Sequence, residues 1–292
     1  NTMGLFQNNQ KNMAYVQQIG NNNDADVAQV AFGGAIPVAN RTDLDQIGDG
    51  NRTEVVQGIS GGNHEANTAT ISITGDDNGN AANGAAGDDW MTMEQYGDLN
   101  DIDVTVVGDR NDVDVIQTGD ENDVLVQAGV YGGADANAVS FDQDGNNNYL
   151  EAKLVSAEGN TVNGAQTGDD NFYRFGIKGD NNAVNLTIDG NDNRGSWGFA
   201  SVFPEQADGN TLDINVVGSG NDTAGEVDGD NNDVDIEQNG TGNEVGTDWY
   251  IRDGVDILGD SNTVIINQSG NDHSSLNTVT GNGNTTTVTQ GN

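Results

Sequence analysis

The chain has no cysteine, two prolines, two histidines and nine lysine and arginine residues among its 292 residues. Without cysteine it can form neither a disulfide nor a thiolate metal site. The nine cations stand against 47 Asp and Glu, which gives a net charge of −38. That balance makes nucleic acid and anionic membrane surfaces poor partners. No apolar run is long enough to cross a bilayer as a helix, so we expect no membrane insertion.

The two histidines offer little for catalysis. Neither His64 nor His273 has a serine or cysteine partner at a recognisable spacing, which disfavours a nucleophilic triad. Carboxylate pairs such as Asp76-Asp77 recur along the chain, whereas a glycosidase needs one pair held at a defined separation in a cleft. Turns such as Gly108 to Asn111 offer oxygen ligands, yet the calcium-binding β-roll repeat is absent. We therefore predict no enzyme, no cofactor and no metal site.

What the sequence does contain is a short repeat that recurs from one end to the other. Its first residue, here called the anchor, is Asn in 22 of 24 copies, the exceptions being Asp89 and His273. The anchors are residues 1, 12, 23, 40, 51, 67, 78, 89, 100, 111, 122, 137, 148, 160, 171, 182, 193, 210, 221, 232, 243, 262, 273 and 284. Because the repeat covers the whole chain, it determines the fold class.

Within each repeat, charge alternates with position. The positions two, four and six after an anchor carry no charged residue in any copy, whereas the positions one, three and five are often charged. Ile102, Val104 and Val106 belong to the first set, and Asp101 and Asp103 to the second. A period of two indicates a strand with one buried and one solvated face. Each repeat therefore predicts one short strand.

The connections between strands fall into two kinds. Counting anchors from zero at Asn1, the spacing from every odd anchor to the next even one is 11, with a glycine three positions before the even anchor. The spacing from even to odd anchors ranges from 11 to 19. The glycines of the constant spacing are Gly20, Gly48, Gly75, Gly97, Gly119, Gly145, Gly168, Gly190, Gly218, Gly240 and Gly270. We expect them to form one fixed arc, since glycine adopts backbone conformations closed to other residues.

The pattern predicts an all-β solenoid with two strands per coil, about 22 residues per coil, and parallel in-register stacking. The single domain would span 1–292 with about twelve coil-equivalents. Its insertions would all lie at one edge, near residues 32–39, 58–66, 129–136, 194–209 and 244–254. The insertions near 194–209 and 244–254 hold aromatic residues, including Trp197 and Trp249. We interpret these aromatics as padding of the variable edge, with a lateral contact or a carbohydrate platform as the alternative.

Amide side chains recur at fixed places in the strands. Gln fills the sixth position after the anchor in 12 of the 24 repeats. Buried amides stacked one coil apart can bond to their own copies as ladders, and such ladders would enforce register. The clearest predicted ladder residues are Asn12, Gln18, Asn23, Gln29, Asn40, Gln46, Asn51, Gln57, Asn111, Gln117, Asn232, Gln238, Asn262 and Gln268.

The motif Asn12-x-Ala14-x3-Gln18-x-Gly20-x2-Asn23 closely resembles the curlin repeat of curli-type bacterial amyloid fibres. The resemblance spans the chain. It implies an extracellular, cell-surface fibre subunit that self-assembles head to tail for biofilm matrix and adhesion. It also implies an outer-membrane secretion pore and a nucleator subunit as partners. Two alternatives stay open: a monomeric β-solenoid stalk, and a glycan-binding adhesin repeat region.

Overall fold

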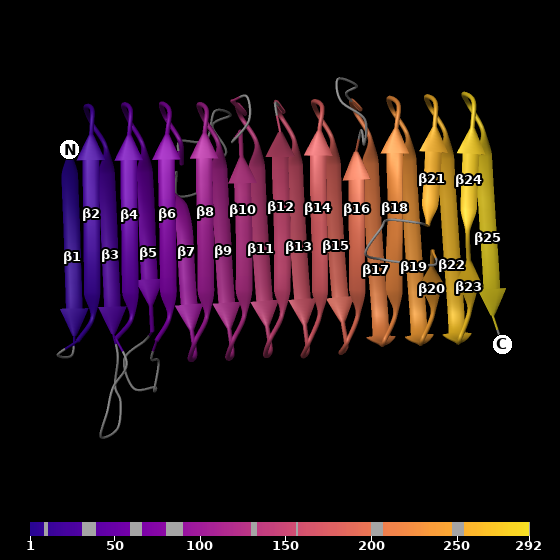
Figure 1. Ribbon diagram of the computed structural model, residues 1–292, viewed down its shortest axis with the longest axis horizontal. Coiled ribbons are helices and arrows are strands. Elements are labelled where there is room, and N and C mark those ends of the chain that lie inside the picture. Colours follow the sequence, from indigo (N-terminus) through magenta and orange to yellow (C-terminus); the bar gives the residue numbers. More distant parts are fainter. Residues whose placement is uncertain are drawn as a thin grey trace. The chain divides into compact units, whose positions relative to one another are not determined.

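The computed structural model describes residues 1–8, 11–30, 39–58, 66–79, 90–129, 133–155, 157–199, 207–246 and 254–291. Throughout these ranges the only regular elements are β-strands, and within each of the two units named below they lie side by side in two sheets of parallel strands (Figure 1). In the described residues there is no helix that could cross a membrane. The chain divides into two compact units, Asn1–Asn147 and Asn148–Asn292, and each is described by itself.

The first unit contains eleven strands in two sheets. One sheet, in spatial order, consists of β1 (Thr2–Asn8), β3 (Asp24–Val30), β5 (Arg52–Gln57), β7 (Met91–Tyr96), β9 (Asp112–Thr118) and β11 (Ala138–Asp144). The other consists of β2 (Met13–Ile19), β4 (Arg41–Ile47), β6 (Thr68–Thr74), β8 (Asp101–Val107) and β10 (Asp123–Ala128). The chain therefore crosses from one sheet to the other after every strand.

The second unit repeats this plan. One sheet consists of β13 (Thr161–Thr167), β15 (Ala183–Asp189), β17 (Thr211–Ser219), β19 (Asp233–Thr241), β22 (Thr263–Asn271) and β25 (Thr285–Gly291). The other begins with β12 (Tyr149–Val155), β14 (Phe172–Lys178), β16 (Arg194–Phe199) and β18 (Asp222–Asp228). It continues with the short strands β20 (Glu244–Val245), β21 (Val255–Leu258), β23 (Ser274–Ser275) and β24 (Asn277–Thr280). Because β20 and β21 both pair with β18, they share one row of the sheet.

The register confirms the predicted two-strand coil. Thr2 pairs with Asp24, and Thr161 pairs with Ala183, so each of these coils contains two copies of the sequence repeat. Insertions lengthen several coils, and the average separation is about 26 residues. The buried face follows the predicted alternation: Ile102, Val104 and Val106 are fully buried between the sheets. Each such aliphatic side chain contributes about 1.5–3 kcal/mol to folding.

Glycines shape the arcs that join the sheets. All eleven glycines predicted for the arc have φ between 110° and 145°, a range that side chains rarely adopt. Close stacking adds a second constraint, because a Cβ on Gly190 would lie 1.8 Å from the carbonyl oxygen of Gly218 in the next coil. The arcs thus combine a backbone conformation and a backbone contact that both exclude side chains.

The expectation that all insertions lie at one edge is wrong for the first unit. The connection that contains residues 31–38 runs from β3 to β4, whereas the one that contains 130–132 runs from β10 to β11. Because β3 and β10 belong to different sheets, these two strands end at opposite edges (Figure 1). In the second unit, the insertion near 244–254 falls between β20 and β21 and interrupts a row of the sheet.

The error arises at the anchors Asn78 and Asp89, which were each expected to begin a strand. Among the described residues a single strand, β7, lies between β6 and β8. Asn78 occupies the anchor place of that coil, because its carbonyl accepts a hydrogen bond from the Arg52 N–H at 2.9 Å. The sequence predicts two strands where the described residues have one. Each later anchor therefore begins a strand in the sheet opposite to the one that its odd or even number predicts. The predicted arc glycines consequently divide between the two edges.

Several residues named from the sequence lie outside the described residues, namely His64, Asp89, Trp249 and most of the predicted insertions. Trp197 is described, and it is fully buried between the sheets of the second unit. It therefore belongs to the core and not to the variable edge where the sequence placed it.

We predict that two glycine substitutions in the second unit differ sharply in cost. Gly190→Ala should lower the free energy of unfolding by more than about 3 kcal/mol, because the methyl group meets backbone at a forbidden φ. Gly220→Ala should cost only about 1–2 kcal/mol, since a Cβ at Gly220 meets no atom within 4 Å and its φ is 64°. Denaturant unfolding of both variants provides the measurement. Equal losses would refute the role of the glycine contact.

Candidate functional site

A column of glutamine side chains runs through the first unit between its two sheets. Each Nε2 donates to the Oε1 of the glutamine one coil later, at distances of 2.7 to 3.0 Å. The members are Gln7, Gln29, Gln57, Gln95, Gln117 and Gln143. This ladder contains three of the predicted residues and three others that share their sequence position.

The same amides also join the two sheets. The Gln57 Nε2 donates to the Arg41 carbonyl oxygen of the facing sheet at 3.0 Å, as well as to Gln95 at 2.8 Å. Gln57 is fully buried, so water cannot replace a lost partner. A buried polar group without a partner costs about 1–3 kcal/mol. The ladder therefore fixes both the stacking of coils and the alignment of the sheets.

Glutamine ladders elsewhere are shorter. In the second sheet of the first unit, Gln18 donates to Gln46 at 2.9 Å, but the next residue in that column is Ile73. In the second unit, Gln238 donates to Gln268 at 2.9 Å, and Gln268 donates to Gln290 at 2.8 Å. Aliphatic residues interrupt the columns, and beside Val216 the Gln238 Oε1 is buried without a hydrogen-bond partner.

The anchor asparagines form a second type of ladder, next to the arcs. The Asn51 backbone N–H and its Nδ2 both donate to the Asn23 Oδ1, at 2.9 and 3.2 Å. The Asn51 Nδ2 also donates to the carbonyl oxygen of the arc residue Gly75 at 2.8 Å. The asparagine side chains thus provide hydrogen-bond partners for backbone N–H and carbonyl groups at the arcs, which glycine has no side chain to provide.

The predicted anchors occupy these ladders in both units. Asn12 and Asn40 lie in one column of the first unit, where the Asn40 N–H donates to the Asn12 Oδ1 at 3.3 Å. Asn111 continues the column of Asn51 through Asn78. In the second unit, the Asn262 N–H donates to the Asn232 Oδ1 at 2.9 Å. His273 stands at an anchor place, where its backbone N–H donates to the Asn243 Oδ1 at 3.2 Å.

Aspartates at the arcs have a structural role that the sequence did not reveal. The Asp49 Oδ1 accepts the Asn21 N–H at 2.7 Å, and the Asp76 Oδ1 accepts the Asp49 N–H at 2.7 Å. Asp109 and Asp135 continue this column at 2.8 Å. Within the described ranges, no group of three or more His, Cys, Asp or Glu residues could hold a metal ion.

Carboxylates on the outer faces of the sheets are crowded. Burial raises the pKa of Asp101 above its ordinary value, and the charge of the neighbouring Asp103 raises it further. Burial likewise raises the pKa of Asp103 and of Asp114. The charged forms of these side chains therefore oppose folding at neutral pH.

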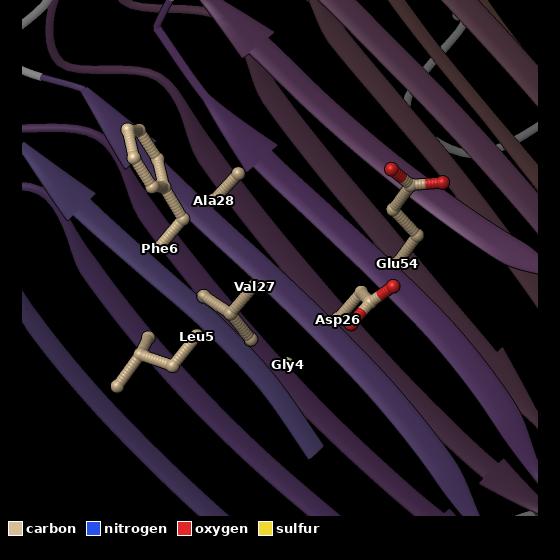
Figure 2. A pocket seen from close by; sticks show the side chains of 7 residues that line it. All are labelled: Gly4, Leu5, Phe6, Asp26, Val27, Ala28 and Glu54. Carbon is tan, nitrogen blue, oxygen red and sulfur yellow. The ribbon is translucent and has the colours of Figure 1, made fainter. Parts of the chain in front are cut away.

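The first coil presents apolar side chains to solvent. Met3 is 54% exposed and Leu5 is 47% exposed, although they stand in the same columns as the buried Ala25 and Val27. Figure 2 shows Leu5 beside Val27 and Phe6 beside Ala28, around a recess that also involves Asp26 and Glu54. Among the described strands, β1 pairs only with β3, and β2 pairs only with β4.

At the other end of the second unit, β25 pairs only with β22 among the described strands. Its inward side chains, Thr286, Val288 and Gln290, are partly exposed. The edges of β1 and β25 thus each present an inward-facing column that an added strand could cover.

No protein-family model matches this chain, and no curated protein matches it.

We predict that Gln57→Leu destabilises the chain by about 2–5 kcal/mol. The change removes the donor to Gln95 Oε1 and an acceptor of Gln29 Nε2, both of which are buried. The matched control is Gln17→Leu on the exposed face of β2, where we expect less than about 0.5 kcal/mol. The measurement is the denaturant midpoint of each variant, compared with that of the wild-type protein. If both variants lose the same stability, the ladder has no special value.

We predict that mild acid stabilises the fold. A carboxyl group whose pKa is raised by folding stabilises the fold when the pH is below its ordinary pKa, which is 3.8 for aspartate. This contribution is lost as pH rises through the folded-state pKa. The denaturant midpoint should therefore rise as pH falls from about 7 to about 4.5. The variant Asp101→Asn with Asp103→Asn should show a flatter dependence. A midpoint that falls steadily over this range would contradict the prediction.

Proposed function

We propose that this chain is a structural fibre subunit that self-assembles head to tail into a curli-like extracellular filament. The supporting observation is the pair of strand edges at β1 and β25, each with a partly exposed inward column. Parallel strands stacked with identical residues in register are the arrangement of cross-β fibres. A second copy of the chain can extend both the sheets and the columns.

The polarity of the glutamine ladders favours head-to-tail joining. At β1, Gln7 uses its Nε2 on Gln29, so its Oε1 can accept a hydrogen bond from an added coil. At β25, Gln290 accepts from Gln268 and donates to the Ser274 carbonyl oxygen at 3.0 Å. Its second amide hydrogen can serve as the donor to an added coil. Head-to-head joining would instead place two acceptors against each other.

The curlin resemblance supports the remaining parts of the proposal. The Asn, Gln and Gly residues that carry the resemblance are those that form ladders and arcs in both units. Extracellular location, export through an outer-membrane pore and a role in biofilm matrix and adhesion follow from this resemblance. The dense carboxylates on the outer faces would limit uncontrolled side-to-side aggregation of filaments.

We predict that Leu5→Lys abolishes filament growth without unfolding the subunit. Leu5 is inward-facing but 47% exposed at the open edge, so a lysine there remains solvated until another coil covers it. Burying an unpaired charge in a joint is strongly unfavourable. The control Phe6→Lys changes an exposed residue on the outer face of the same strand and should leave growth unaffected. Electron microscopy and sedimentation of both variants are the measurements.

Wild-type protein that stays monomeric in every condition tested would overturn the fibre proposal and favour a solenoid stalk. Equal growth of the Leu5→Lys and Phe6→Lys variants would also count against joining through this edge. A far-ultraviolet circular dichroism spectrum establishes that each variant retains its β-structure.

A further inference from the structure

Eleven of the twelve glutamines at the sixth position after an anchor make the same hydrogen bond between the sheets. The Nε2 of each donates to the carbonyl oxygen of the first residue in the preceding row, which lies in the facing sheet, at 2.9 to 3.3 Å. Gln290, for example, donates to Ser274, the first residue of β23. The eleven are Gln18, Gln29, Gln46, Gln57, Gln95, Gln117, Gln143, Gln166, Gln238, Gln268 and Gln290. This bond thus joins each of these strands to the row before it.

Gln7 is the twelfth glutamine, and it lacks this bond. It lies in β1, the first described strand, and its Nε2 donates to the Gln29 Oε1 at 2.7 Å. An amide nitrogen carries two hydrogens, so one hydrogen of Gln7 has no acceptor among the described residues. In a head-to-tail fibre, the strand that supplies the acceptor belongs to the neighbouring copy.

Each end of the chain presents two open strand edges. Among the described strands, β1 pairs only with β3 and β2 only with β4, while β25 pairs only with β22 and β24 only with β21. Paired rows are two rows apart along the chain, so each crossing between the sheets advances the stack by half a coil. β1 therefore projects half a coil beyond β2, and β25 projects half a coil beyond β24.

One way to join two copies is to pair β25 with β1 of the next copy. Both projecting strands then lie in one sheet, and the facing sheet has an empty row between β24 and β2. The backbone N–H and carbonyl groups along the two edges of that row find no strand partner. The second hydrogen of Gln7 also points toward this empty row.

We propose that the copies instead join by a lap joint, in which β25 pairs in parallel with β2 of the next copy. In the same joint, β1 of the next copy pairs with the row of β23 and β24. Every row is filled, and β1 follows β25 as each strand follows the row before it. The first residue of β25 is Thr285, whose carbonyl oxygen accepts the second hydrogen of Gln7. The lap joint rests on the proposed head-to-tail fibre and specifies its contact.

The inward columns of β25 and β2 match in the register that the chain uses throughout. Val288 meets Val16, and Gln290 meets Gln18. The Gln290 Nε2 then donates to the Gln18 Oε1, just as the Gln18 Nε2 donates to the Gln46 Oε1 at 2.9 Å. The inward side chains of both strands are partly exposed in the single chain, and the joint covers them.

The contact of β1 with β24 leaves one acceptor unmet. Gln7 and Val279 both stand six positions after their anchors, so the Gln7 Oε1 lies beside an aliphatic side chain. The Gln238 Oε1 has the same situation beside Val216 within the chain, where it is buried without a partner. One such acceptor is a smaller penalty than a whole row of unpaired backbone groups.

Cysteine cross-linking distinguishes the two joints, because the chain has no cysteine of its own. The exposed outward residues Thr289 and Gln17 are register partners in the lap joint. In the alternative joint, Thr289 instead pairs with Phe6. Paired strands lie about 4.8 Å apart, within the reach of a disulfide, whereas the two sheets lie about 10 Å apart, beyond that reach.

Single-cysteine variants of the full chain are mixed one to one, assembled under reducing conditions and then oxidised. Thr289→Cys with Gln17→Cys should give covalent dimers on non-reducing gels, on the order of tenfold or more above Thr289→Cys with Phe6→Cys. Thr289→Cys with Met13→Cys is the register control, because its cysteines lie about 13 Å apart along the strand direction. This control should give no dimers.

Electron microscopy before oxidation judges head-to-tail growth separately from the joint. If filaments form and the Phe6→Cys mixture gives the dimers, the lap joint is overturned while fibre growth stands. Filaments in which no mixture cross-links overturn it as well. Absence of filaments from the wild-type protein overturns both proposals. If Thr289→Cys prevents assembly, Thr285→Cys replaces it, with Met13→Cys as the lap-joint partner and Thr2→Cys as the alternative.

Discussion

The structure depends on buried amides whose hydrogen-bonding groups are met by the equivalent residues one coil away. Gln57 is fully buried, and its partners include Gln29, Gln95 and two backbone carbonyls, those of Arg41 and Asn67. A shift of one residue would turn each buried amide outward and bring an outward residue into the core. A shift of two residues would keep every side chain on its own face, and aliphatic columns alone would tolerate it, whereas it would separate each amide from its copy in the next coil. The amides therefore determine the register, and the aliphatic columns supply most of the stabilisation.

The hydrogen bonds of the asparagine anchors explain where insertions can occur in the chain. Many asparagine anchors donate a side-chain hydrogen bond to an arc carbonyl, as Asn51 does to Gly75. This hydrogen bond involves only the anchor and the arc of the next coil. Residues can therefore be inserted between the arc and the following strand without breaking it. Asn78 shows this well, because it keeps its place in the column although β7 begins only at Met91. Insertions can consequently occur at either edge without breaking the stack.

The sequence was sufficient to predict the coil and the glutamine columns, because alternation along a strand and a two-strand repeat each follow from elementary geometry. It failed at Asn78 and Asp89, where two anchors at the usual spacing fit the period although the described residues contain one strand. The spacing of anchors does not show which sheet a strand joins. One anchor too many therefore assigned every later connection to the wrong edge. The role of Asp49 was also hidden, since its partner is the backbone N–H of Asn21, in an earlier coil.

The two kinds of ladder run in opposite directions along the stack. Glutamine donors point toward the later coil, as from Gln57 to Gln95, whereas asparagine donates back to the earlier coil, as from Asn78 to Asn51. The carbonyl dipoles of the two ladders are therefore opposed. An α-helix sums its peptide dipoles and develops partial charges at its ends, whereas the two opposed ladders offset each other in part in those coils that contain both. The amides therefore add less to the field at the ends of a stack than ladders of one direction would, and the outer carboxylates are the charges that govern how solenoids approach one another.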